Sequence, residues 1–210
     1  MVGMRTVRKI IAVAALVVAT SSCGDVIRQG RSPVYLVISG LQGAQGNHAS
    51  ALGNGVSSDV ITLVTSPAPC TDTNPCPTIF GDIGQVTLRT SLKDIGTGTL
   101  ATSPTTNNEV TITRYHITYR RADGRNTPGV DVPYGFDGAT TGTVPGTGTL
   151  TLGFTLVRNI AKAEAPLVQL ISSPNVISTV ADITFYGHDQ VGNEVSVSGS
   201  IDVTFANFGD

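Results

Sequence analysis

Apolar and polar residues alternate along much of this chain with the two-residue period of β-strands. The clearest stretch is 149–156, where Leu150, Leu152, Phe154 and Leu156 alternate with Thr and Gly. Such alternation predicts strands with one buried face. Including short apolar runs, the pattern predicts seven strands, at residues 34–39, 60–64, 86–93, 110–121, 149–156, around 183–185 and at 195–205.

The spacing of these strands favours an antiparallel fold. They lie about 15–25 residues apart, and only residues 160–171 have a helical pattern, which Pro166 limits to a turn or two. Parallel strands need crossover connections, usually helices, so a parallel α/β fold is disfavoured. We predict an all-β antiparallel sandwich of about seven strands, forming one domain over residues 33–210. Its long loops are 40–58, 66–84, 96–108 and 122–148.

The strand at 110–121 changes phase in its middle. Val110 and Ile112 share one phase, whereas Tyr115, Ile117 and Tyr119 share the other. A shift of one residue turns a strand over. We therefore expect a β-bulge or a switch of sheet at residues 113–114.

The first residues have the pattern of an export signal. Arg5, Arg8 and Lys9 make the start basic, the apolar run 10–19 follows, and small residues lead to Cys23. The apolar run is too short to cross a membrane as a helix.

The end of this segment, residues 20–24, resembles a bacterial lipobox, in which the Cys becomes the first mature residue and carries the lipid. Thr20 departs from the Leu that is usual there. The resemblance implies a signal peptide at 1–22, a lipidated tether at 23–32 with palmitate or a similar acyl chain on Cys23, and a membrane-anchored protein of the cell envelope. Gly24 in place of Asp favours the outer membrane, facing the periplasm or the surface. The alternative is a secreted protein cut after Ser21, with Cys23 as an ordinary thiol.

Composition and charge limit the classes of partner that this protein is expected to bind. The chain is 40% apolar with a net charge of -2, which disfavours a disordered protein, and its 15 acidic against 13 basic residues disfavour a nucleic-acid binder. Removal of residues 1–22 would leave ten basic residues against all 15 acidic ones, so the mature protein would be acidic. An acidic protein gains nothing from anionic headgroups, so the acyl chains would make the membrane contact.

Cys70 and Cys76 lie in a Pro-rich polar loop at 66–77. In an exported chain whose third Cys carries lipid, this pair predicts a disulfide. A metal pair is the alternative, but no neighbouring His or second Cys pair supports it.

Residues 181–197 form an alternating strand, a turn with Asp, Gly and Asn, and a returning strand. They resemble the closing F–G hairpin of bacterial immunoglobulin-like and fibronectin-type-III-like modules, and 113–121 is similar to the central Tyr-containing strand of the latter. The resemblance implies an immunoglobulin-like sandwich. The chain lacks Trp, and its two loop Cys are neighbours, which departs from the antibody pattern.

Candidate reactive residues are scattered. His48, His116 and His188 have no His or Cys at ligand spacing, and we expect the latter two on a solvent-facing sheet surface. Segment 189–194, with Asp182 and Asp202, lacks the spacing of a calcium loop, so a hairpin turn with positive φ at Gly192 and Asn193 is the preferred interpretation.

Two further segments are candidates for ligand sites. The Gly-rich stretch 142–148 matches no phosphate-binding motif and is interpreted as a linker. Tyr134 and Phe136 are candidates for exposed aromatics that stack on a sugar, or for plugs at the end of a sandwich.

These observations favour a non-catalytic envelope lipoprotein for binding, adhesion or assembly, with no cofactor and no metal. Its expected partners are the membrane, through the lipid anchor, and envelope proteins or glycans. The alternative is a carbohydrate- or peptide-binding module that uses the long loops or a free sheet edge. An enzyme is disfavoured because no reactive constellation is visible.

Overall fold

A computed structural model describes residues 31–94 and 103–209. In these ranges the chain forms ten strands, one short α-helix and three 3-10 helices. The strands are β1 (Val34–Ala44), β2 (Gly55–Asp59), β3 (Thr62–Val64), β4 (Cys76–Thr78), β5 (Asp82–Leu92), β6 (Val110–Arg120), β7 (Phe136–Val144), β8 (Leu150–Val157), β9 (Ile177–Asp189) and β10 (Glu194–Ala206). The helices are η1 (Gly46–His48), η2 (Thr106–Asn108), α3 (Asn159–Lys162) and η3 (Leu167–Ser172).

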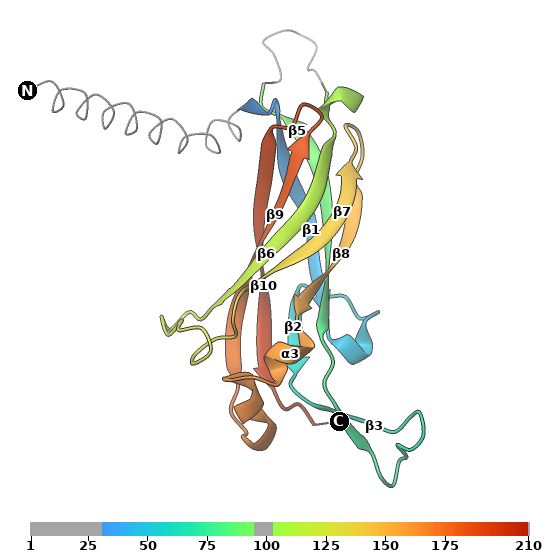
Figure 1. The fold of residues 1–210 in the computed structure, drawn as a ribbon, viewed down its shortest axis with the longest axis vertical. Helices are drawn as coiled ribbons and strands as arrows, with labels where there is room; N and C mark the ends of the chain where they lie inside the picture. Colours follow the sequence, from blue (N-terminus) through green and yellow to red (C-terminus); the bar gives the residue numbers. More distant parts are fainter. Residues whose placement is uncertain (1–30, 95–102, 210) are drawn as a thin grey trace, which may run out of the picture.

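Two sheets pack face to face, which confirms the prediction of an all-β sandwich (Figure 1). One sheet has the order β1-β5-β8 and the other β2-β10-β9-β6-β7. Neighbouring strands are antiparallel except for β2, which pairs in parallel with the end of β10. Strands β3 and β4 form a separate two-stranded ribbon.

The long strands give the molecule two distinct ends (Figure 1). The N-terminal end carries the start of β1 and the β9–β10 turn. The opposite end, called the loop end here, carries residues 45–54, the β3–β4 ribbon, and the connections 121–135 and 158–176. Residues 45–54 and the connections 121–135 and 158–176 therefore lie far from the start of β1.

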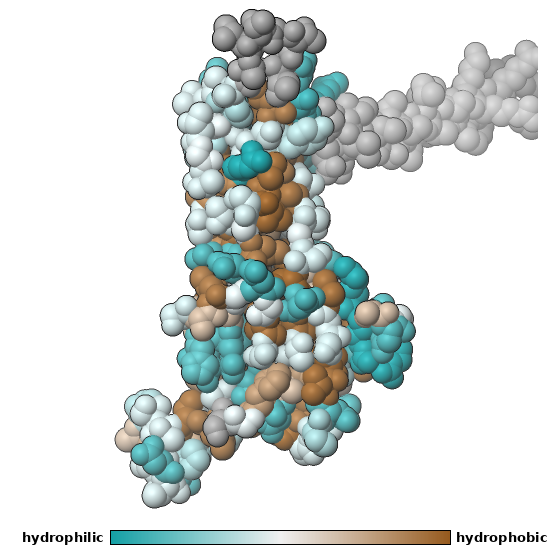
Figure 2. All heavy atoms as spheres, turned by 180° about the vertical axis from the view of Figure 1, so that it is seen from behind, coloured by the Kyte–Doolittle hydropathy of each residue, from teal (hydrophilic) through white to brown (hydrophobic). Residues whose placement is uncertain are grey.

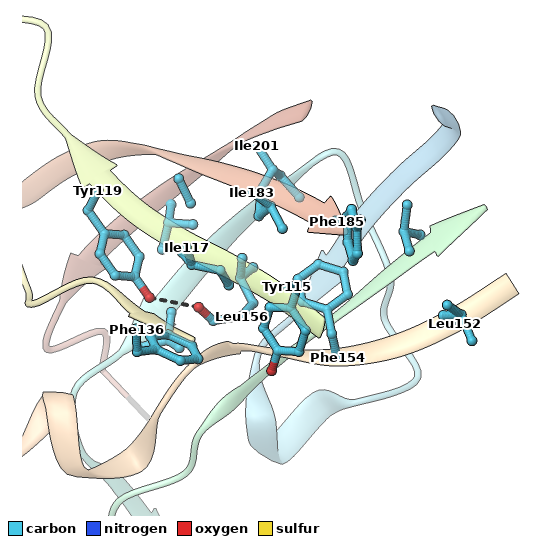
Figure 3. Packing of buried hydrophobic residues seen from close by; sticks show 14 of the residues in the cluster. Tyr115, Ile117, Tyr119, Phe136, Leu152, Phe154, Leu156, Ile183, Phe185 and Ile201 are labelled. Atoms are coloured by element: carbon cyan, nitrogen blue, oxygen red, sulfur yellow. Dashed lines mark hydrogen bonds between the residues drawn. The ribbon is translucent and has the colours of Figure 1, made fainter. Parts of the chain in front are cut away.

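The core forms where the inner faces of the two sheets meet. Phe185 of β9 is fully buried, and its ring centroid lies 5.3 Å from that of Phe154 and 6.2 Å from that of Tyr115 (Figure 3). Aromatic pairs at such separations are favourable beyond the area they bury. The sheets are thus joined by aromatic packing from β6, β8 and β9.

The predicted irregularity of β6 is present. Its register with both β7 and β9 shifts between Ile112 and Arg114. Beyond the shift, Tyr115, Ile117 and Tyr119 all face the core. The bulge is therefore confirmed, and β6 stays within one sheet.

The two tyrosines of β6 also bond the opposite sheet. The register of β8 with β5 shifts between Asp82 and Ile83, leaving Leu156 without a directly opposite residue. The Tyr119 hydroxyl donates to the Leu156 carbonyl oxygen at 2.7 Å (Figure 3), and the Thr155 amide donates to the Tyr115 hydroxyl at 3.1 Å. The hydroxyls therefore satisfy backbone groups beside an irregularity in the ladder.

The sequence prediction missed three strands, β2, β4 and β7. The interpretation of 142–148 as a linker was wrong for residues 142–144, which belong to β7, and holds only for the residues after Val144, which connect β7 to β8. The inner positions of β7 include two glycines, whose space is taken by neighbouring side chains: Tyr115 lies over Gly138, and leucines of β8 lie beside Gly142. Strand β7 therefore carries little apolar signal of its own.

Candidate functional site

A charged pair lies buried where the sandwich meets the loop end. Strand β5 begins at Asp82, and α3 ends at Lys162, and both side chains are 0% exposed. The Lys162 Nζ donates to Asp82 Oδ1 at 2.9 Å and to the backbone carbonyl of Asp59 at 2.8 Å. Buried charges are tolerated when they are paired and hydrogen-bonded, and this pair meets both conditions.

Further donors surround the Asp82 carboxyl. The Ser58 hydroxyl donates to Oδ2, and the Gly46 amide donates to Oδ1 at 3.1 Å. Burial raises the pKa of Asp82, and the Lys162 ammonium and these hydrogen bonds offset only part of that rise. The pair thus links β5, β2 and α3 in a fully buried position.

A separate groove of about 560 Å³ opens at the surface of the loop end. It lies between the β6–β7 connection and the segment 166–177. Val130 and Val176 supply exposed apolar surface, being 67% and 54% exposed. The lining also contains polar and charged side chains, namely Arg121, Arg125, Asp131, Gln169, Ser173 and Asn175.

The arginines of this groove are held by one carboxylate. Arg121 donates to Asp123 at 3.1 and 2.7 Å, and Arg125 donates to the same carboxylate at 3.1 Å. The hydrogen bond from Arg121 is the main reason that the pKa of Asp123 falls to about 2. The carboxylate therefore stays charged at neutral pH and fixes the start of the β6–β7 connection.

The rest of that connection is also ordered by local bonds. The Thr127 amide donates to the Asp131 carboxylate at 3.1 Å, and the Thr127 carbonyl accepts amides of the following turn. Gly129 has a φ of 76°, a conformation that side chains rarely adopt, and the Tyr134 ring lies against it. A groove wall built this way is preformed, which lowers the entropic cost of binding.

The lining of this groove is suited to binding a ligand. Apolar surface beside arginine, amide and hydroxyl groups suits a ligand with both apolar and hydrogen-bonding parts, such as a peptide or a glycan. Within residues 31–94 and 103–209, no group of three or more His, Cys, Asp and Glu side chains is placed to hold a metal ion.

Among the predicted site residues, Cys23 lies outside the described residues. Cys70 and Cys76 are at bonding distance and form a disulfide, as predicted. The disulfide closes the tip of the β3–β4 ribbon, which projects from the loop end (Figure 2).

The three histidines are far apart in the fold. His48 is exposed in η1, and His188 is exposed on β9. His116 lies on the outer face of the five-stranded sheet, where its Nδ1 is 3.1 Å from Asp137. His116 and His188 thus occupy the solvent-facing surface that was predicted.

The segment after Asp189 is a hairpin turn, as predicted. The Asp189 carboxylate accepts the amides of Val191 and Asn193 at 3.1 and 2.8 Å. Burial alone would raise the pKa of Asp189, but the side-chain amide of Asn193, which donates to Oδ2 at 2.9 Å, and these backbone bonds together lower it. Only Gly192 has positive φ, at 84°, so the prediction of the same conformation for Asn193 was wrong.

The other two acidic residues weighed as calcium ligands are separate from this turn. Asp182 accepts 2.6 Å hydrogen bonds from Arg120 and from Ser200. Asp202 is exposed on β10 and pairs with Gly55 and Val180 of the neighbouring strands.

The two candidate aromatics differ in exposure. Tyr134 is 53% exposed, but Phe136 is only 9% exposed, so Phe136 fits the interpretation as a plug and not that of a surface aromatic. The guanidinium of Arg158 lies 4.6 Å from the Phe136 ring centroid and covers it.

Sequence reasoning missed both the Asp82–Lys162 pair and the groove. The pair is separated by 80 residues, and lysine is rarely buried, so no local pattern points to it. The one available signal for the groove is the cluster of charged residues at 120–125, at the start of a long connection.

No family model matches this chain, and neither the curated proteins nor the solved structures contain a match. In the described ranges no helix has the length and apolar character needed to span a membrane.

Proposed function

We propose that this protein is a non-catalytic lipoprotein of the cell envelope, whose immunoglobulin-like module binds a partner through the loop end. The observation that carries the proposal is the placement of the two ends (Figure 1). Strand β1 starts at Val34, just after the proposed lipidated tether at 23–32, whereas the groove lies at the far end of the strands. A membrane anchor on Cys23 would leave that far end free to meet a partner.

The strand order supports an immunoglobulin-like assignment. If β5, β6, β8, β9 and β10 are taken as strands B, C, E, F and G, one sheet reads A-B-E and the other contains G-F-C. This is the division of strands between the sheets of immunoglobulin domains, and β7 then takes the C′ position beside C. The hairpin at 181–197 falls on F and G, the strands that it resembles in sequence.

A second candidate is favoured by the groove itself: a peptide- or glycan-binding module. Its exposed apolar residues, Val130 and Val176, lie beside the Arg121 and Arg125 guanidinium groups. Arginine donates in a fixed planar fork, so it suits carboxylate and carbonyl groups of such ligands. In this case the module would act by ligand capture, whether or not it also assembles with envelope proteins.

The anchor is tested by mass spectrometry of the protein extracted from membranes. We expect an N-terminal peptide that begins at Cys23 and carries acyl chains. The variant Cys23→Ser should be released from the membrane fraction. An unacylated N-terminus in the wild type would refute the anchor.

Binding is tested on a glycan array and a peptide panel with the fragment 31–210. Val176→Asp places a charge in the groove, and Val191→Asp is a matched control because Val191 is 83% exposed at the opposite end. We expect the groove variant to lose at least tenfold in affinity and the control to bind as the wild type does. Equal binding by both variants would exclude the groove, and no binding above background would refute the second candidate.

A further inference from the structure

The Asp82–Lys162 pair has the arrangement of two groups that can react with each other. A primary amine and a carboxyl group lie 2.9 Å apart, measured from Nζ to Oδ1, with both side chains 0% exposed. An isolated ion pair in such a place has a large desolvation cost, which its Coulombic attraction does not always offset. An amide bond between Nζ and Cγ would carry no charge to desolvate.

We propose that Lys162 and Asp82 condense into an intramolecular isopeptide bond between Nζ and Cγ. The bond would join the first residue of β5 to the last residue of α3, which are 80 residues apart in sequence. This inference does not depend on the membrane anchor or on what the groove binds.

The reaction is balanced by the two side chains alone. Transfer of a proton along the Nζ–Oδ1 hydrogen bond gives a neutral amine beside a neutral carboxylic acid. The Nζ lone pair attacks Cγ, the new C–N bond forms, and the Cγ–Oδ1 bond breaks. Nζ gives up two protons in total, both of which leave with Oδ1 as one molecule of water. No oxidant, cofactor or other reactant is needed.

The surroundings favour this step. Burial raises the pKa of Asp82, which makes the neutral acid more accessible. The Ser58 hydroxyl donates to Oδ2, so it can stabilise the negative charge that develops on this oxygen during the attack. Lys162 is held from a second side by the Asp59 carbonyl, which orients Nζ toward the carboxyl group.

The product would keep most of the present hydrogen bonds. Oδ2 becomes the amide oxygen and continues to accept from Ser58. The remaining N–H of Lys162 continues to donate to the Asp59 carbonyl, which now lies at 2.8 Å. Only the Gly46 amide, which is partly buried, would lose its acceptor.

Mass spectrometry of the purified wild-type protein tests the proposal directly. We expect an intact mass lower by one water molecule than the disulfide-bonded sequence requires. Trypsin does not cleave after an acylated lysine, so digestion of the denatured protein should give peptide 32–89 joined to peptide 159–210. Tandem spectra should place the link at Asp82 and Lys162.

A control is needed because Asp–Gly sequences also lose water, by forming succinimides, and this chain has them at Asp123 and Asp137. Lys162→Arg removes the nucleophile but retains a cation, so it should abolish the joined peptide and the isopeptide mass loss. A wild-type protein of full mass, with free peptides 32–89 and 163–210, would overturn the proposal. A water loss that maps to Asp123 or Asp137 without a joined peptide would overturn it equally. The wild-type peptide map decides even if the variant does not fold.

Discussion

Replacing Tyr119 with Phe removes one hydroxyl from the interior without leaving a large cavity. The Tyr119 ring is 5% exposed and packs with its centroid 6.0 Å from that of Phe205. Its hydroxyl donates to the Leu156 carbonyl at 2.7 Å, at the irregularity between β8 and β5. The variant therefore isolates the contribution of one hydrogen bond that crosses between the sheets.

The expected cost follows from what remains after the change. Leu156 is fully buried, so its carbonyl oxygen loses this partner in a place that water does not readily reach. An unsatisfied buried acceptor costs about 1–3 kcal/mol, and we expect a loss of about 2 kcal/mol in the free energy of unfolding. With a urea m-value of about 2 kcal/mol/M, the unfolding midpoint should fall by about 1 M.

The assay is urea unfolding followed by circular dichroism at neutral pH. Tyr35→Phe is the matched control, since Tyr35 is 55% exposed and loss of its hydroxyl should change stability by less than about 0.5 kcal/mol. Equal midpoints for the two variants, with unchanged m-values, would refute the assigned role of the Tyr119 hydroxyl.

The same residue predicts a dependence on alkaline pH. Burial raises the pKa of Tyr119 strongly, the nearby Asp82 carboxylate adds to the rise, and Arg158 opposes it. A group with a raised folded-state pKa stabilises the fold fully below its unfolded pKa, which is about 10 for Tyr, and this contribution is lost as the pH rises further. The stability difference between the wild type and Tyr119→Phe should therefore shrink above about pH 10, and a constant difference would contradict the pKa shift.

Three further predictions concern the turn, the sheet and the ribbon. Asp189→Ala should cost about 1–2 kcal/mol in unfolding experiments at neutral pH. Because the pKa of Asp189 is lowered, the difference from the wild type should vanish as the pH falls through the acidic range below about 4. Gly187→Ala would bring a methyl group against the carbonyl oxygen of Thr111, and thermal unfolding should show a loss of about 1–3 kcal/mol. Reduction of Cys70–Cys76, which are only six positions apart, should lower global stability by at most about 2 kcal/mol and increase amide exchange mainly in the β3–β4 ribbon.

The alternation of apolar and polar residues predicted those strands whose inner positions hold apolar side chains. Strand β8 has an apolar side chain at every inner position, and the phase change in β6 located the bulge to the residue pair. Strand β7 was not predictable in this way, because Gly138 is covered by Tyr115, a residue from another strand. Strand β2 was hidden for a different reason: its buried residues include the polar Ser58 and Asp59.

The candidate site was harder to predict from the sequence than the fold. Lysine and aspartate usually lie at the surface, so the burial of Lys162 and Asp82 depends on their meeting across the fold. The groove was foreseen only as a property of long loops, since its walls come from the β6–β7 connection and from 166–177, which have no common sequence pattern. The disulfide was predictable because both of its cysteines lie in one short loop.

The run of β1 along the three-stranded sheet determines how the molecule would respond to a mechanical load. Ten residues of β1 pair with β5, from Val34 at the N-terminal end to Ala44 near the loop end. The ladder hydrogen bonds lie perpendicular to the strands. A pull on the chain before Val34, resisted at the opposite end, acts along the strand axis and strains these bonds in shear, all at once. Peeling a strand from its end would break them one by one, so the sandwich is oriented to withstand tension between its two ends.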